Sequence, residues 1–305
     1  MKRPVPSYPL FHLLPAVLVF LLCRQLAFAG NATEAYYYAG NNRPSEESGA
    51  IRKIVKETVS DKKYWLHTYI RSDHGWDPVK SELIRIKSPE EQIIALYQGN
   101  LRLSRTVRHV SPSDDGGYDF EETTKGVLVR KGHATSLIPL HLEGRVDEYY
   151  PDGALRSEEF YRDNQLVWNL NWLENGDKYI DSIFYSVDRW PQYEEGEVAM
   201  KSHMNNYIVK SRYFSKDLVG TVLLGFVIMK NGELEGVRVV NKSQLPIAEA
   251  VRESLETLPG RWKPALLDGR TVRCYMTFPV NFKVRSNVQF ENVEIMGNQI
   301  FYNYR

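Results

Sequence analysis

The side chains that most often bind metals or act as nucleophiles are sparse in this sequence. Its seven histidines lie at positions 12, 67, 74, 109, 133, 141 and 203, and none belongs to the H-E-x-x-H pair that holds zinc. Cys23 lies in an N-terminal apolar stretch, and Cys274 lies on the apolar side of a predicted strand. If the N-terminal stretch is removed, Cys274 alone can form no internal disulfide. We therefore expect no metal site and a buried thiol at Cys274.

Motifs for other chemistry are absent as well. The sequence has no G-x-S-x-G, no phosphate-binding P-loop and no G-x-G-x-x-G. Asp114-Asp115-Gly116-Gly117 lacks the alternating acids and the closing Glu of a calcium loop, so it predicts a turn. We expect that the chain is not an enzyme, with no catalytic residues and no cofactor, and we identify no small-molecule substrate.

The charge distribution argues against nucleic-acid binding. The first 29 residues contain Lys2, Arg3 and Arg24 but no acidic residue, which leaves 36 basic and 38 acidic residues in the rest of the chain. Nucleic-acid binders usually carry a concentrated basic surplus. We therefore expect a protein partner and no nucleic acid.

The N-terminus resembles an export signal. A basic start precedes the apolar run Leu10–Leu22, and Ala27-Phe28-Ala29 is an A-x-A cleavage site. The run is short for a bilayer span, which needs about 20 residues. We predict a signal peptide over 1–29, cleaved after Ala29, and a periplasmic or exported protein. An uncleaved inner-membrane anchor and a lipoprotein at Cys23 are the lesser alternatives.

The next segments differ in character. Residues 30–62 are polar and mixed, which predicts a linker. Residues 63–186 contain short apolar and aromatic runs separated by turn signals such as Asp152-Gly153 and Asn175-Gly176. Glycine and asparagine accept the positive φ of hairpin turns. This pattern predicts an all-β region of short antiparallel hairpins.

Part of the hairpin region repeats. "YPDG" begins at Tyr150, "YRDN" at Tyr161 and "WLENG" at Trp172, so an aromatic residue recurs every 11 residues. Such a period is one strand and one turn. Residues 144–185 resemble the MORN-like, antitoxin-type repeats of bacterial proteins. That resemblance implies a β scaffold and supplies no catalytic residues.

Residues 187–284 predict an α+β domain with the order helix, β-hairpin, helix, strand and one antiparallel sheet. Apolar residues at helical spacing occur in 197–208 and 247–258. Between them, alternating residues on both sides of Asn231-Gly232 predict a hairpin. The last strand alternates through Val272, Cys274, Met276, Phe278, Val280 and Phe282. Residues 285–305 form a C-terminal tail.

This C-terminal region resembles the TonB C-terminal domain of Gram-negative energy-transducer proteins, over about a third of the chain. The structural signature of the resemblance is Gly232, Trp262, Pro264, Phe278, Pro279 and Phe282. The other matching residues are Pro191, Gly196, Gly220-Thr221-Val222, Phe226-Val227, Val237–Val240, Lys263, Gly269, Val272 and Val280-Asn281.

The resemblance implies a binding mode. In that family, an edge strand pairs with a short receptor segment, the TonB box, by β-strand addition. The candidate edge here is 271–284. Proline is tolerated mainly at edges or bulges, which fits Pro279. The residues expected to face outward along this strand are Arg273, Tyr275, Thr277 and Asn281. The tail contains the alternating stretch "NVQFENVEI", which could itself pair with this edge.

Two functions follow from these observations. The first is an exported envelope protein that docks partner segments, with an outer-membrane TonB-dependent receptor as the candidate partner, linked to transmembrane transport. The second is an interaction protein whose β repeats bind the partner and whose TonB-like domain is a folded cap, without energy transduction. The chain lacks the Pro-rich spacer of energy transducers, and Ser7 and His12 bracket the start of the apolar run. Membrane association through an uncleaved N-terminal segment remains open.

Overall fold

The computed structural model describes residues 32–215, 217–241, 243–282 and 289–290. The chain divides into two compact units, Met1–Gly30 and Asn31–Arg305, and every element below belongs to the second. The predicted signal peptide, its cleavage site after Ala29 and Cys23 lie outside the described residues, as does most of the tail.

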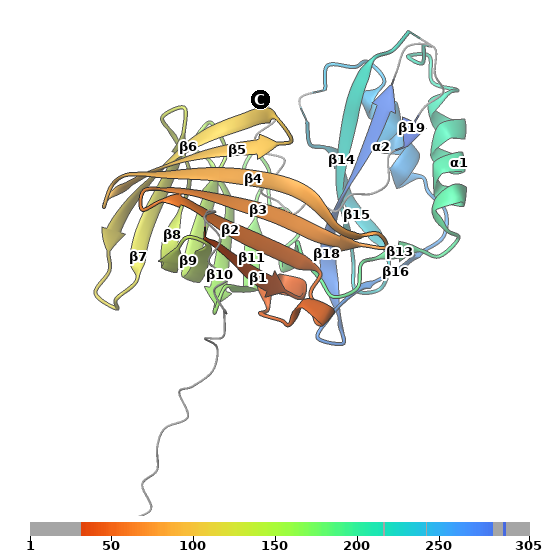
Figure 1. Cartoon of the computed structure of the whole chain (residues 1–305). Coiled ribbons are helices and arrows are strands. Elements are labelled where there is room, and N and C mark those ends of the chain that lie inside the picture. The colour runs from red at the N-terminus through yellow and green to blue at the C-terminus, as the bar shows by residue number, and fades with distance from the viewer. Residues whose placement is uncertain (1–31, 216, 242, 283–288, 291–305) are drawn as a thin grey trace, which may run out of the picture. The chain divides into compact units, whose positions relative to one another are not determined.

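The N-terminal half of the second unit is a single antiparallel sheet in which eleven strands are neighbours in chain order (Figure 1). Most of the turns between strands are short, which favours this order because each strand returns beside the one before it. The predicted antiparallel β structure is confirmed for this region. The strands are β1 Thr33–Tyr38, β2 Arg52–Ser60, β3 Lys63–Ser72, β4 Gly75–Ser88, β5 Glu91–Gln98, β6 Leu101–Pro112, β7 Tyr118–Thr124, β8 Val127–Leu137, β9 Leu140–Tyr149, β10 Leu155–Arg162 and β11 Gln165–Asn171.

The linker prediction for 30–62 is wrong. This segment contains β1 and β2, which pair with each other, and β2 also pairs with β3 from Arg52↔Ile70 to Ser60↔Lys63. Two short 3-10 turns, η1 Gly40–Asn42 and η2 Glu47–Gly49, connect β1 to β2. The polar composition concealed these strands, because no residue of β1 or β2 is fully buried and the two strands therefore need few apolar residues.

The two ends of the large sheet are joined through Asn41, which follows β1. Its side-chain amide donates to the Leu166 carbonyl at 2.9 Å and accepts from the Leu166 N–H at 3.0 Å. The Asn41 side chain thus makes the two hydrogen bonds to Leu166 that a neighbouring strand would make. In addition, Ile138 from the β8–β9 turn packs on a cluster that includes Leu66 and Ile84 of β3 and β4. The sheet is therefore rolled, with one face turned inward.

The repeated aromatic residues lie at or next to the ends of successive strands of this sheet. The Tyr150 hydroxyl donates to the Trp172 carbonyl at 2.9 Å, which connects the first and third copies. Asn164, which replaces glycine in the second copy, adopts a φ of 62°. That conformation is open to asparagine more readily than to most residues with a Cβ.

The C-terminal half forms a second sheet with two helices. Helix α1 is Glu197–Ile208 and α2 is Ala248–Glu256. The sheet order is β12-β18-β14-β15, with β17 and β19 also pairing with β18, and β13 pairs with β16. The strands are β12 Ile183–Phe184, β13 Gln192–Tyr193, β14 Gly220–Ile228, β15 Leu234–Val239, β16 Trp262–Lys263, β17 Ala265–Leu267, β18 Arg270–Phe282 and β19 Gln289–Phe290.

The core of this half lies between the helices and one face of the sheet. Met200, Met204 and Ile208 of α1 and Val251 and Leu255 of α2 are buried there. The alternating residues of β14 and β18 complete it. Those residues are Val222, Leu224, Phe226 and Ile228 together with Met276, Phe278, Val280 and Phe282.

Candidate functional site

Strand β18, the predicted docking strand, is not a free edge. It pairs with β14 along its whole second half, from Cys274↔Ile228 to Phe282↔Gly220. On its other edge it pairs with β12 in parallel at Arg273 and Cys274, and with β19 at Val280 and Asn281. The edge interpretation of 271–284 is therefore wrong at the positions where β12 and β19 pair with the strand, and residues 283–284 lie outside the described residues. It failed because β12 precedes the predicted domain, which begins only at residue 187.

The tail stretch, which the sequence indicated could pair with β18, does so at two described positions. Val280 lies opposite Phe290, and Asn281 lies opposite Gln289. Both residues of β19 belong to the alternating tail stretch. The chain therefore uses its own C-terminal segment to cover one end of this strand.

The hydrogen bonds of Leu223, the β14 residue opposite Pro279, show which way the N–H and carbonyl groups of β18 point. The Leu223 N–H donates to Asn241 Oδ1 at 2.9 Å, and its carbonyl accepts from the Val240 N–H at 2.8 Å. Both groups of Leu223 thus point toward β15, so Leu223 and Pro279 form a pair without mutual hydrogen bonds. The proline, which has no N–H, therefore removes no hydrogen bond to β14.

The same alternation determines the direction of the backbone N–H and carbonyl groups in the residues near Pro279. Tyr275 and Thr277 share its parity, so their N–H and carbonyl groups also point away from β14. Within the described residues, no strand pairs with Tyr275–Pro279 on that side. We call this stretch the β18 window. It is flanked by β12 at one end and by β19 at the other.

The predicted outward residues are not exposed. Tyr275 and Thr277 are only 8% and 2% exposed. Arg273 is half-buried and donates to the Asp181 carbonyl at 2.7 Å. Asn281 is half-buried and accepts from the Thr221 hydroxyl at 2.6 Å. The expectation of an outward-facing side-chain row was therefore wrong for Tyr275 and Thr277.

The burial of Tyr275 comes from the segment between the two halves of the chain. Tyr275 and Val227 cluster with Ile183, and Tyr179 and Tyr185 pack against them. The rings of Tyr185 and Tyr275 meet edge to face at 5.8 Å. Alternation along β18 shows which residues share a face but cannot show that the second face is covered, because the covering residues lie about 90 positions earlier in the sequence.

The residues of the structural signature lie in and around the core. Trp262 is 6% exposed, and its ring centroid lies 5.9 Å from that of Phe226 and 5.5 Å from that of Tyr193. Pro264 separates β16 from β17. Phe278 and Phe282 are buried in the core cluster. Trp262, Phe278 and Phe282 are therefore core residues.

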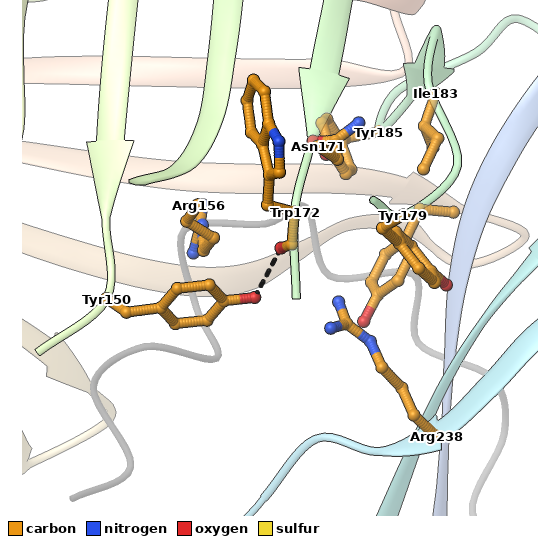
Figure 2. Close-up of a pocket in the computed structure, with 9 residues that line it drawn as sticks. Tyr150, Arg156, Asn171, Trp172, Tyr179, Ile183, Tyr185 and Arg238 are labelled. Atoms are coloured by element: carbon orange, nitrogen blue, oxygen red, sulfur yellow. Dashed lines mark hydrogen bonds between the residues drawn. The ribbon is translucent and has the colours of Figure 1, made fainter. Parts of the chain in front are cut away.

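A small cavity lies where the two halves meet. Its volume is about 20 Å³, and its lining includes Tyr150 and Arg156 from the large sheet and Arg238 and Tyr275 from the second sheet. Figure 2 shows the Arg238 side chain reaching from β15 toward the hydroxyls of Tyr150 and Tyr179. The Arg238 guanidinium carbon lies 4.5 Å from the centroid of the Tyr179 ring.

A buried polar row leads across the inner face of the large sheet toward this cavity. Its members lie directly opposite one another on successive strands, and its four central positions alternate between arginine and glutamate. Arg108 and Arg130 both contact Glu122, at 2.7 and 2.9 Å, and Glu148 pairs with Arg156. The row consists of Gln92, Arg108, Glu122, Arg130, Glu148, Ser157 and Asn171.

The pKa values of the two glutamates of the row are shifted in opposite directions. Burial raises the pKa of Glu122, but the guanidiniums of Arg130 and Arg108 outweigh it and lower this pKa to about 2. Burial, together with the neighbouring carboxylate Glu159, raises the pKa of Glu148 to about 8. Sequence inspection did not reveal this row. Several of its successive members are 14 or more positions apart, and only the strand register places them side by side.

Two kinds of feature are absent from the described residues. They contain no group of three or more His, Cys, Asp or Glu side chains placed to hold a metal ion. None of their helices is long and apolar enough to cross a membrane. Cys274 is a buried free thiol, as the strand parity predicted, and burial raises its pKa far above the usual range.

One known family matches the C-terminal half. Residues 214–284 match the family model of the Gram-negative bacterial TonB protein C-terminal. The match spans β14 to β18 and supports the resemblance found in the sequence. Searches of curated proteins and of solved structures returned no match. The resemblance of residues 144–185 to MORN-like repeats therefore stays a prediction.

Proposed function

We propose that this protein binds extended segments of partner proteins at the β18 window by β-strand addition. The family match indicates a TonB-like energy-transducer or interaction role. The observation that supports this particular mode is the backbone of Tyr275–Pro279. Its outward N–H and carbonyl groups have no strand partner among the described residues. Such groups give affinity in strand addition, whatever side chains surround them.

Docking requires a rearrangement of the segments that flank the β18 window, which are the residues around β12 and β19. Thr277 is 2% exposed, so a partner strand cannot reach the window in this conformation. Among the described residues, β19 pairs with β18 at two positions, and we expect the partner segment to displace this short contact. The tail then acts as an internal competitor for the partner segment.

The partner class follows from the family. We propose a receptor segment of the TonB-box type as the ligand and a periplasmic or exported location, with export after cleavage at Ala29. N-terminal sequencing of the protein purified from the envelope should begin at Gly30. An intact Met1 in the membrane fraction would instead favour an anchored transducer, and lipid labelling that disappears in Cys23→Ser would favour a lipoprotein.

The decisive experiment titrates the full chain with TonB-box peptides from receptors of the same organism. Deleting residues 285–305 should strengthen binding, because the competing strand is removed. Thr277→Pro, which deletes one outward N–H, should weaken binding at least tenfold more than Thr277→Val, which keeps the N–H and the side-chain shape. Circular dichroism must show that both variants fold. Absence of binding by both the full chain and the truncated chain would overturn the proposal.

A second candidate function places the partner on the large sheet. Tyr37, Lys53, Tyr69 and Trp76 form a partly exposed aromatic and cationic patch on β1–β4, with the Lys53 amine 5.0 and 4.9 Å from the centroids of the Tyr69 and Trp76 rings. Aromatic residues of this kind are enriched at protein interfaces. Partner capture that is lost in Trp76→Ala but kept in Thr277→Pro would favour this function.

A further inference from the structure

The outer face of β3–β6, four neighbouring strands of the large sheet (Figure 1), contains a cluster of basic side chains. Leu66 and Ile84 belong to the inner cluster, so the residues that alternate with them, such as Lys63 and Arg85, face outward. We call the cluster the basic patch. It consists of Lys63, which is half-buried, and of Arg85, Arg102 and Arg105, which are exposed.

The acidic side chains on this face already have partners. Glu91 of β5 forms an ion pair with Lys87 at 2.8 Å, and Glu57 of the neighbouring β2 lies 3.6 Å from the His67 imidazole. The hydrogen bond from Lys87 is the main cause that lowers the pKa of Glu91, and the charge of Arg105 adds a smaller part. Among the described residues, none forms an ion pair with a member of the basic patch.

Two members of the basic patch repel each other. Lys63 lies directly opposite Arg85 on the same face of β3 and β4, and like charges at directly opposite positions destabilise a sheet. The acidic residues of the adjoining turns, Asp61 and Glu90, form no ion pair with either of them within the described part of the chain. An anionic ligand would relieve this repulsion.

Aromatic and small side chains lie among the basic ones. The rings of Trp65 and Tyr97 meet edge to face at 5.4 Å. Arg105 lies opposite Ala95, and Arg102 lies opposite Tyr97. Tryptophan, tyrosine and arginine are the residue types that most often dominate protein interfaces. The surface therefore combines positive charge with an aromatic floor.

The chemistry and size of the patch indicate its ligand. Three of its four members are arginines, whose planar guanidinium donates two parallel hydrogen bonds to a carboxylate. The patch extends from β3 to β6, or about 14 Å, which is the length of about five extended residues. The chain beyond residue 29 has 36 basic and 38 acidic residues, so a wide anionic surface such as a bilayer would meet repulsion elsewhere on the protein. A short acidic segment fits better.

We propose that the basic patch is a docking surface for an acidic segment of a partner protein. Carboxylates of the segment pair with Arg85, Arg102 and Arg105, and an apolar side chain packs on Trp65 above the small Ala95. The patch borders the aromatic and cationic patch on β1–β4 but is distinct from the β18 window. It needs no strand addition.

The test is a fluorescence-anisotropy titration of a fluorescein-labelled peptide of glutamate and leucine with the full chain. Raising sodium chloride from about 50 to about 500 mM should weaken binding at least tenfold, because salt screens exposed charge pairs. Arg105→Gln should weaken binding at low salt by a similar factor. Arg270→Gln, which removes an exposed arginine of β18 and changes the net charge equally, should bind as the wild type does, and so should Thr277→Pro.

Arg102→Gln repeats the test if Arg105→Gln does not fold, which the melting temperature shows. A matched peptide with glutamine in place of glutamate should not bind. Absence of binding by the acidic peptide at low salt, equal binding of the two peptides, or unchanged binding in both patch variants would each overturn the proposal. Binding to phosphatidylglycerol vesicles without binding to the peptide would also overturn it and would identify a membrane-binding face instead.

Discussion

The Trp262 N–H donates to the Gly232 carbonyl at 2.9 Å. This contact holds the β14–β15 turn against the start of β16, 30 positions later in the chain. Gly232 adopts a φ of +82°, and a Cβ at this position would lie 2.1 Å from the Trp262 carbonyl oxygen. Only glycine fits, both for its backbone conformation and for the space available.

Gly232→Ala should destabilise the protein by about 2–4 kcal/mol, as strain at positive φ and a backbone clash add together. Gly269→Ala is the matched control, because Gly269 has a φ of +72° and a Cβ added there would meet nothing within 4 Å. That control should cost only about 1 kcal/mol. Urea unfolding of both variants measures the difference, and equal losses would refute the role of the Trp262 contact.

Trp262→Ala should lower the free energy of unfolding by about 3–5 kcal/mol, because it removes a large buried ring from the core. Trp168, which is 36% exposed, provides the control, and its replacement by alanine should cost much less. If the two losses were equal, the core position of Trp262 would not matter for stability.

Glu148 should make stability depend on pH. Its pKa in the folded chain, about 8, lies above the ordinary value of 4.5, so the folded state binds the proton more tightly than the unfolded state. The resulting stabilisation is complete below pH 4.5 and is lost as the pH rises to about 8. Its size is on the order of a few kcal/mol.

Glu148→Gln mimics the protonated form and should remove this loss. In denaturant unfolding from about pH 5 to about pH 9, the wild type should therefore lose stability relative to Glu148→Gln as the pH rises. Glu121→Gln, on the exposed face of β7, is the control and should follow the wild type. Parallel curves for Glu148→Gln and the wild type would contradict the raised pKa.

The boundary of the C-terminal domain can be tested by fragments. The predicted start at residue 187 removes Ile183, which is 1% exposed and pairs with Arg273 through β12. A fragment from residue 178 to 305 should therefore melt several degrees above a fragment from 187 to 305. Equal melting temperatures would show that β12 does not contribute and would support the boundary predicted from the sequence.

The sequence alone determined the local features of this protein. Turn pairs such as Asp152-Gly153 and Asn175-Gly176 marked the ends of strands, because glycine and asparagine are the residues that adopt a positive φ easily. The signature around Trp262 and Phe278 identified the TonB-like region, which the family match supports. Alternation also predicted the buried thiol of Cys274. All of these depend on neighbours that lie a few positions apart.

Only the tertiary structure decided which faces and edges are covered. Tyr275 has the same parity in the sequence whether its side of β18 meets solvent or protein, and the segment around Ile183 buries it. The polar row from Gln92 to Asn171 likewise exists only through strand register. A charged residue becomes tolerable in the interior when a partner of opposite charge lies across the next strand. Sequence spacing does not encode that placement, because it results from pairing between distant segments.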